Sequence, residues 1–540
     1  MAGLVKAPRD TYSDPVPSAA AREGGWLGRL RTTPGRLRAG VALVVLLACG
    51  LGLLTGMVFA ALGSGFTAIG GHDAPLVEQS NALYYAVSDM DAQVGNVLLT
   101  GSDPALAADQ KQDLALYASD EQHAEQDLQQ VAVTAAADPA VQRAVGSVLD
   151  ALGRYQALAA DAIVVNQRGH DPAGRPSAAT LSYFQQATDL MSTTVQPAAA
   201  SLTTANARAL DMSYSQDRST ATSGQVLVLV LGLAVAGVLI GTQVFLAARF
   251  RRLINPALVA ATVLAVGLAI AGAVQLHAQA GNLKVAKQDA FDSILALTQA
   301  RAVSYDANAD ETRFLVDPGR AAAYQDAFLR RSQELVNVGN VGIFSYDAAL
   351  AADIGVYQAD NSDVRFGGDL GTEFRNITFT GERAVATRAL LTYQVYEKDD
   401  RALRAMAKIN LAQAIAFDIG TGPGQSDWAF NQWDGALGSV ITINENAFTA
   451  AIRDGHSTGT PWIALIPAIG TALIAALTIA GTHRRLAEYR LRGEIVALVQ
   501  VIDEPGLDRP PPEELAGLRA GGRLVDREDL PQPAEILGRN

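Results

Sequence analysis

"VALVVLLACGLGLLTGMVFAAL" (residues 41–62) contains no charged side chain. About 20 consecutive apolar residues are enough for a helix to cross the hydrocarbon core of a bilayer. Three more uncharged apolar runs follow, at residues 225–248, 256–276 and 462–480. Because backbone polar groups in lipid must be satisfied within their own segment, these runs predict four transmembrane helices. Buried helices of a soluble protein are the alternative, and runs of this length disfavour it.

The first run has a second interpretation as a cleaved signal. "LLACG" (residues 46–50) resembles the box that directs lipid attachment to a cysteine. However, apolar residues continue well past Cys49, and the run is longer than the apolar region of a signal peptide. We therefore expect an uncleaved span in which Cys49, the only cysteine, packs as a small apolar residue.

Arginine clusters flank the runs and predict their orientation. By the positive-inside rule, all three clusters belong in the cytoplasm, and they consist of Arg29, Arg31, Arg36 and Arg38, then Arg249, Arg251 and Arg252, then Arg484, Arg485, Arg490 and Arg492. The chain is thus expected to be a multi-pass cell-membrane protein with both termini in the cytoplasm. The predicted division is a cytoplasmic segment 1–40, span 41–62, a first extracytoplasmic four-helix bundle 67–223, span 225–248, a cytoplasmic loop 249–255, span 256–276, a second extracytoplasmic helical bundle 277–460, span 462–480 and a cytoplasmic tail 482–540.

Apolar periodicity predicts the bundles. Leu76, Leu83, Met90 and Val97 recur every seven residues, as in a helix that packs along one face. Four such helices joined by short connections predict an antiparallel bundle whose core does not depend on the second segment. In the second segment we expect helices over residues 320–338, 382–417 with a break near residue 399, and 426–452, and an irregular connection over 360–376. The expected fold class is an all-α membrane protein with four transmembrane helices and two extracytoplasmic helical bundles.

One pattern occurs in both segments expected outside the cell, residues 67–223 and 277–460, which are called the exported segments on that expectation. "AVSDMDAQVGNVLLTGSDP" (residues 86–104) and "AVSYDANADETRFLVDP" (residues 302–318) both begin Ala-Val-Ser, carry acids and close on Asp-Pro. An acid before a proline is typical of a helix start. Each stretch is therefore expected to end the first helix of its bundle at the pole far from the membrane. "GTGPGQSDW" (residues 420–428) is expected as a helix–helix turn at the same pole, next to residues 304–318.

The sequence carries no recognisable catalytic motif. The six histidines lack metal-ligand spacing, "GTGPGQ" lacks the lysine of a phosphate loop, and no serine nucleophile elbow occurs, so we expect no enzyme, no cofactor and no metal. A net charge of −13 argues against a nucleic-acid partner. The spans carry no charged residue that would line a transport pathway. Asp306, Asp310 and Glu311 could supply paired carboxylates, but a solvent-exposed face with weak ion pairs to Arg313 is the expected arrangement.

Three stretches resemble a known family. "YDANADETRFLVDP" (residues 305–318), "GTGPGQSDWAF" (420–430) and "RRLAEYR" (484–490) are together similar to an actinobacterial family of four-span membrane proteins. Its members are encoded beside a glutamine-type periplasmic amino-acid-binding lipoprotein and protein kinase G. The first exported segment also resembles the four-helix-bundle sensor domains of chemoreceptors. The resemblance implies a signal relay from the binding lipoprotein outside to the cytoplasmic serine/threonine kinase.

The resemblance and the expected pole together predict a docking edge for an external protein. Aromatic side chains are enriched among interface hot spots, so Trp428 is the expected anchor. A direct small-molecule sensor and a non-signalling scaffold are the alternatives. Membrane lipid is a further expected partner, and a homo-oligomer stays open. The residues of the predicted docking edge are Asn308, Asp310, Glu311, Arg313, Gln425, Ser426 and Trp428.

Overall fold

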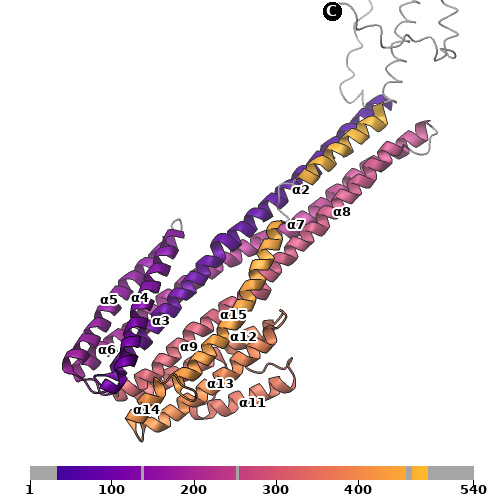
Figure 1. Ribbon diagram of the computed structural model, residues 1–540. Coiled ribbons are helices and arrows are strands. Elements are labelled where there is room, and N and C mark those ends of the chain that lie inside the picture. Colours follow the sequence, from indigo (N-terminus) through magenta and orange to yellow (C-terminus); the bar gives the residue numbers. More distant parts are fainter. Residues whose placement is uncertain (1–32, 135–138, 251–254, 458–464, 484–540) are drawn as a thin grey trace, which may run out of the picture. The chain divides into compact units, whose positions relative to one another are not determined.

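The computed structural model describes residues 33–134, 139–250, 255–457 and 465–483 (Figure 1). Within these ranges the chain forms helices and short connections without a strand, apart from one isolated bridge between Asn337 and Gly367. Four helices are long and apolar enough to cross a membrane. The all-α class and the four spans are thus confirmed. The predicted arginine clusters lie outside the described residues, apart from Arg36, Arg38 and the helical position of Arg249.

The first half of the chain forms long helices. Each apolar span is continuous with helix of the exported segment, since unbroken helical runs extend over Thr33–Thr100 and Ala178–Ala248. The elements are α2 (Thr33–Ala68), the π turn η1 (Ile69–Asp73), α3 (Ala74–Thr100), the 3₁₀ turn η2 (Pro104–Leu106), α4 (Ala107–Thr134), α5 (Pro139–Gly169), α6 (Ala178–Leu190), the π turn η3 (Met191–Val195) and α7 (Gln196–Phe250).

The second half begins in the same way and then departs from the first. An unbroken run over Pro256–Val316 is followed by shorter helices. The elements are α8 (Pro256–Lys284), the π turn η4 (Val285–Phe291), α9 (Asp292–Val316), the 3₁₀ turn η5 (Pro318–Arg320), α10 (Ala321–Leu335), α11 (Ile343–Ala359), α12 (Gly368–Asn376), α13 (Glu382–Ala407), α14 (Leu411–Asp418) and α15 (Ser426–Ser457), before the last span helix Leu465–His483.

Two local predictions for the second half were wrong, and one helix was missed. The stretch 360–376, expected to be irregular, contains α12, which has Asp369 in its first turn and Arg375 in its last, as the helix dipole favours. Helix α11 was not expected. The break in the long helix falls at residues 408–410, where the Asn410 side chain caps α14 by accepting a hydrogen bond from the Gln413 amide at 3.3 Å.

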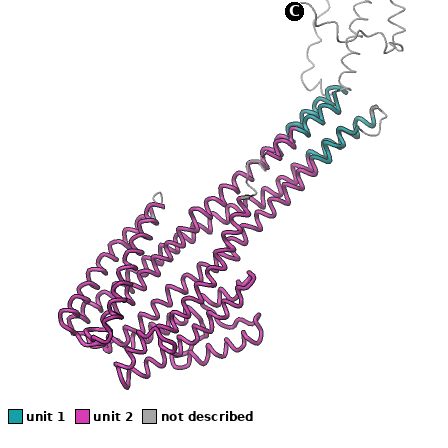
Figure 2. The backbone as a smooth tube through the Cα atoms, viewed as in Figure 1, with its two compact units in different colours: residues 1–48, 235–264, 473–540 teal, residues 49–234, 265–472 magenta. Residues whose placement is uncertain are grey.

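The chain divides into two compact units (Figure 2). One comprises residues 1–48, 235–264 and 473–540. In its described part, Leu239 and Leu258 are buried, and the Asn255 amide donates to the Gly481 carbonyl at 2.7 Å. The other unit comprises residues 49–234 and 265–472, so both exported segments belong to one unit.

The hydrophobic core of the first exported segment is shared with the second. The side chains of the predicted heptad seam, such as Leu83 and Met90, are fully buried, but Leu315, Leu403 and Ile415 belong to the same core cluster. The expectation of an independent core was therefore wrong, because side chains from α9, α13 and α14 complete it. A second cluster, rich in aromatic residues such as Tyr393 and Trp433, lies within the second segment.

Helices α3 and α9 carry the two copies of the Ala-Val-Ser pattern, and the exported segments that contain them are called the two copies. Alignment of Ala302 with Ala86 makes each residue of the second copy the counterpart of the residue numbered 216 lower in the first. The Thr312 hydroxyl donates to the Asn96 side chain at 2.9 Å, and these two residues are counterparts. The Arg301 guanidinium lies 4.9 Å from the ring centroid of its counterpart, Tyr85. Because contact partners rise in number together, the two helices run parallel and nearly in register, as in a twofold dimer.

The π turns follow the same correspondence. Turn η1 begins at Ile69 and turn η4 at Val285, which are counterparts. The third π turn, η3, ends at Val195, two residues before Pro197 in the first turn of α7. Proline has no backbone N–H and so interrupts the hydrogen-bond pattern of an α-helix. A π turn is one way in which the neighbouring backbone adjusts to such an interruption.

Candidate functional site between the exported segments

The charged stretches of α3 and α9 lie in the protein interior. Asp310, Glu311 and Arg313 expose 1%, 0% and 2% of their surface. Every residue of α3 from Ala86 to Thr100 is buried. The expectation of a solvent-exposed charged face was therefore wrong, because α3 and α9 are covered on all sides by helices of both segments.

Arg313 joins the two copies. Its Nη1 donates to Asp310 Oδ1 at 2.7 Å within α9, and its Nη2 pairs with the Asp91 carboxylate of α3. Asp91 also accepts a hydrogen bond from the Tyr155 hydroxyl of α5 at 3.0 Å. Charge-assisted hydrogen bonds among fully buried groups are strong, and loss of one partner leaves an uncompensated charge.

Arg331 of α10 extends this network. Its Nε lies 3.2 Å from Asp306 Oδ2, and its Nη1 pairs with Asp310. The Gln196 amide of α7 donates to Asp306 and also to the Ser88 hydroxyl of α3, the latter at 3.3 Å. One continuous set of polar contacts therefore connects α3, α5 and α7 with α9 and α10.

The two motifs expected at one pole are neighbours. The Ser426 hydroxyl, at the start of α15, donates to Glu311 Oε2 of α9 at 3.3 Å, which confirms their predicted proximity. Burial raises the pKa of Glu311 well above its ordinary value, and the nearby carboxylates of Asp400 and Asp418 raise it further. Glu311 therefore favours its protonated form more than an exposed glutamate does.

A second group of carboxylates gathers around α3 and α4. Burial raises the pKa of Asp113 to about 8, with a contribution from the negative charges of Asp427, Asp109 and Asp89. Burial likewise raises the pKa of Asp120 to about 8, together with the adjacent Asp89 carboxylate. Both pKa values are thus raised by burial and by neighbouring carboxylates, whereas Arg331 and Arg313 partly offset the effect of burial on the pKa of Asp310.

The loop before α15 holds the remaining predicted docking residues. Gln425 and Trp428 are half-buried, and Gln425 Oε1 accepts a hydrogen bond from the Gly422 amide at 2.9 Å. Trp428 packs against the aromatic core of the second segment. Asn308 is buried and hydrogen-bonds to Asp427. Partner binding by these residues stays a prediction, and a partner would reach Gln425 and Trp428 first.

Sequence reasoning missed Asp91, Gln196 and Arg331 as members of the network. The sequence did contain a signal for Asp91. Arg313 is the one cation of an acidic stretch, and all charged residues in the matching stretch of the first segment are acids, so the two stretches carry complementary charges. Gln196 and Arg331 lie outside both quoted stretches and carry no comparable pattern.

Residues 65–215 match a family model described as an actinobacterial sensor domain. The matched region runs from the end of α2 through α3, α4, α5 and α6 into α7. Comparisons with curated proteins and with solved structures gave no significant match. The family match and the four apolar helices support a membrane protein with a sensing or signalling role.

Proposed function

We propose that this protein relays amino-acid status across the cell membrane, from a periplasmic amino-acid-binding lipoprotein to a cytoplasmic serine/threonine kinase. The observation that carries the proposal is helix continuity. Three unbroken helical runs, Thr33–Thr100, Ala178–Ala248 and Pro256–Val316, extend from the shared polar network through an apolar span. A displacement of α3 relative to α9 can therefore reach the far end of the same helices.

The parallel α3/α9 pair and the π turns suggest how the signal is transmitted. Polar contacts such as Thr312 with Asn96 specify one register, and a sliding or rotating helix would have to exchange them. A π turn contains one extra residue relative to the α-helical ladder and is frequent at functional sites. Turns η1 and η4 lie between the polar network and the spans of their own helices, where they can absorb such a change.

The proposed arrangement has both termini in the cytoplasm, acts without catalysis and contacts lipid through the spans. Exposed apolar side chains on the span helices, such as Leu53, Val230, Val263 and Ile469, fit a lipid environment. Single cysteines in a Cys49→Ala background test the topology. Cysteines replacing Asp150 and Asp326, both exposed, should react with an impermeant thiol reagent in intact cells, and cysteines at positions 252 and 488 should not. Labelling at 252 from outside would refute four spans in this orientation.

The external partner is tested by site-specific crosslinking. A photoreactive amino acid in place of Ile409, which is 88% exposed, or of Trp428 should capture the amino-acid-binding lipoprotein in intact cells. The same group at Leu149, which is exposed on α5, is the matched control. If neither Ile409 nor Trp428 yields the lipoprotein, the relay does not receive its signal at this pole. Capture of the kinase from a site in residues 482–540 tests the cytoplasmic end.

A further inference from the structure

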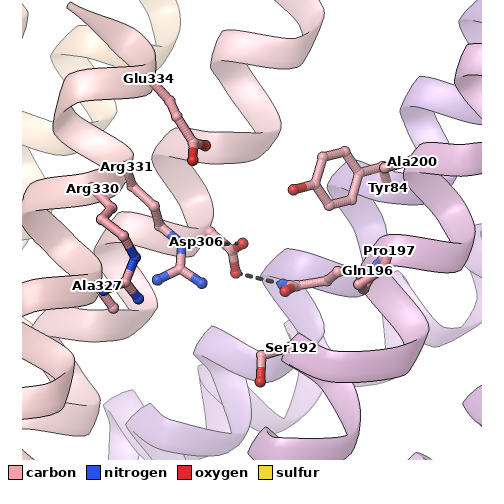
Figure 3. A pocket seen from close by; sticks show the side chains of 10 residues that line it. All are labelled: Tyr84, Ser192, Gln196, Pro197, Ala200, Asp306, Ala327, Arg330, Arg331 and Glu334. Atoms are coloured by element: carbon pink, nitrogen blue, oxygen red, sulfur yellow. Dashed lines mark hydrogen bonds and ion pairs between the residues drawn. The ribbon is translucent and has the colours of Figure 1, made fainter. Parts of the chain in front are cut away.

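A cavity of about 220 Å³ opens between the two exported segments (Figure 3). Four long helices contribute to its lining: α3 with Tyr84, α7 with Gln196, α9 with Asp306, and α10 with Arg330, Arg331 and Glu334. A water molecule takes up about 30 Å³ of the liquid, so the cavity has room for a molecule of several non-hydrogen atoms. The first segment contributes the Tyr84 hydroxyl to the lining, and the second segment contributes the acidic and basic groups.

The inner end of the cavity is formed by the polar network. Asp306 is 3% exposed and lies against Arg331 and Gln196. The buried network contains three carboxylates, of Asp91, Asp306 and Asp310, and two guanidinium groups, of Arg313 and Arg331. With all five ionised, the network has one more negative charge than positive. A positively charged group beside Asp306 would offset this excess.

The outer end of the cavity carries two opposite charges, and the positive charge of Arg330 partly offsets the rise that burial causes in the pKa of Glu334. Arg330 and Glu334 are exposed and lie one turn apart on α10, and Arg330 forms no ion pair with any residue that the structure describes. In Figure 3 the Glu334 carboxylate and the Tyr84 hydroxyl face the space beside Asp306, the Arg331 guanidinium lies next to Asp306, and the Arg330 guanidinium lies beside that of Arg331. A ligand carboxylate could therefore accept hydrogen bonds from guanidinium donors while remaining close to acidic groups.

We propose that this cavity binds a small zwitterion of the α-amino acid class. The ligand carboxylate contacts Arg330 and a free N–H of Arg331. The ligand ammonium group contacts Asp306, Glu334 and the Tyr84 hydroxyl. Asp306 already pairs with Arg331, whereas Arg330 and Glu334 form no ion pair with any residue that the structure describes. A simple anion would therefore satisfy only Arg330 and a simple cation only Glu334, so a ligand with both charges satisfies the lining best.

Such a ligand would bridge the two copies. It would contact α3 and α7 of the first segment and α9 and α10 of the second, and α7 continues into an apolar span. Binding would thus favour one arrangement of α3, α7, α9 and α10 over others. This inference goes beyond the relay proposed above, because here the chain itself recognises a small molecule and no binding protein is required.

Calorimetric titration of the purified full-length chain in lipid nanodiscs, without any binding protein, tests the proposal. Each of the twenty standard amino acids is titrated separately, and at least one should bind. Arg330→Gln and Glu334→Gln should each weaken that binding about tenfold or more, since each removes a charge-assisted hydrogen bond to the ligand. Both residues are exposed, so unchanged thermal unfolding should show that the variants stay folded. Arg388→Gln, an exposed arginine on α13, is the matched control and should bind like the unaltered chain.

Two analogues of the bound amino acid define the ligand class. The amine without the carboxylate and the acid without the amine should both bind at least tenfold more weakly than the zwitterion. Full-strength binding of either analogue would overturn the zwitterion assignment. Failure of all twenty amino acids to bind, or equal binding by Arg330→Gln, Glu334→Gln and Arg388→Gln, would overturn the site. The relay is tested by crosslinking to a lipoprotein, so either proposal can fail without the other.

Discussion

Helices α3 and α9 occupy equivalent places in the two copies, but they differ in how their buried charges are balanced. Helix α3 carries Asp89 and Asp91 and no cation among residues 86–100. Helix α9 carries its own Arg313 between its acids and the Asp-Pro end, and it receives Arg331 from α10. Asp306 and Asp310 of the second copy are thus neutralised by cations of their own segment, and Asp89 and Asp91 of the first depend on the second copy or on protonation.

This difference explains why the copies pair within one chain. Arg313 is the counterpart of Val97, and Asp91 is the counterpart of Ala307. Two identical α3 helices would place carboxylates together without a cation, and two identical α9 helices would lack Asp91 as an acceptor. Pairing α3 with α9 provides the attraction and avoids the like-charge arrangement, which is how a specific pair excludes alternatives. The two copies therefore form an internal dimer in which α3 pairs with α9 in preference to a second α3, and α9 pairs with α3 in preference to a second α9.

The largest effect is expected when the two copies are separated. Residues 67–223 expressed alone should be helical but should lack a sharp thermal transition, because Leu315, Leu403 and Ile415 are missing from the core and Asp91 has lost Arg313. Circular dichroism at increasing temperature measures this. Mixing with a fragment of residues 277–460 should restore a cooperative transition. A sharp transition of the first fragment alone, as steep as that of the full chain, would show that the core is independent after all.

Removal of the bridging cation should have the next largest effect. Arg313→Met leaves Asp91 and Asp310 buried without their shared partner, so the free energy of unfolding should fall by about 3–5 kcal/mol. Arg388→Met, on the exposed face of α13, is the control and should change it little. Adding Asp91→Asn and Asp310→Asn to Arg313→Met should recover much of the loss. Chemical denaturation in a mild detergent measures all three variants, and equal stability of Arg313→Met and Arg388→Met would refute the bridging role.

The carboxylates of the first copy should make stability depend on pH. The pKa of Asp113 and that of Asp120 are raised from 3.8 to about 8, so between pH 4 and pH 8 the folded state binds more protons than the unfolded state. The free energy of unfolding should therefore fall as pH rises through this window, by at most about 1.4 kcal/mol per pH unit for each group.

Two asparagine variants check this pH dependence. Asp113→Asn and Asp120→Asn should each raise the melting temperature at pH 8 and flatten its dependence on pH, since asparagine has no charge to bury. Asp150→Asn, on the exposed face of α5, is the control and should leave the profile unchanged. A profile that is steepest above pH 8, or one that Asp113→Asn and Asp120→Asn do not flatten, would contradict the assignment.

Local patterns predicted much of this molecule. The four uncharged runs predicted the spans, and the Asp103 cap before Pro104 is present, with the Asp103 side chain accepting from the Ala105 amide at 2.9 Å. The turn at residues 420–428 was also placed correctly beside α9. These features depend on short-range chemistry or on helix length, which one sequence displays directly.

Burial of the charged stretches could not be predicted in the same way. A run such as "DANADETR" (residues 306–313) is typical of a solvated face when a helix is considered alone. Its burial depends on α10, α13 and α15 and on the whole first segment, all distant in sequence. The cation for Asp91 lies 222 residues away, and no local pattern specifies that distance. The exposure predicted for the charged stretch was therefore wrong, and partner binding by its residues stays a prediction.

The smallest expected effect provides the sharpest test of the register between α3 and α9. Asn96 and Thr312 are counterparts whose side chains hydrogen-bond at 2.9 Å, so they should be energetically coupled. Thr312→Val preserves shape and removes the hydroxyl, and Asn96→Ala removes the acceptor. A double-mutant cycle should give a coupling of about 1 kcal/mol, the usual net value of one hydrogen bond. Thr442→Val, whose hydroxyl bonds only the Gly438 carbonyl of its own helix, combined with Asn96→Ala should show no coupling. Denaturation midpoints of the full chain measure both cycles. If the first cycle also gives zero, the two helices do not pair in this register, and the internal dimer would need a different alignment of its copies.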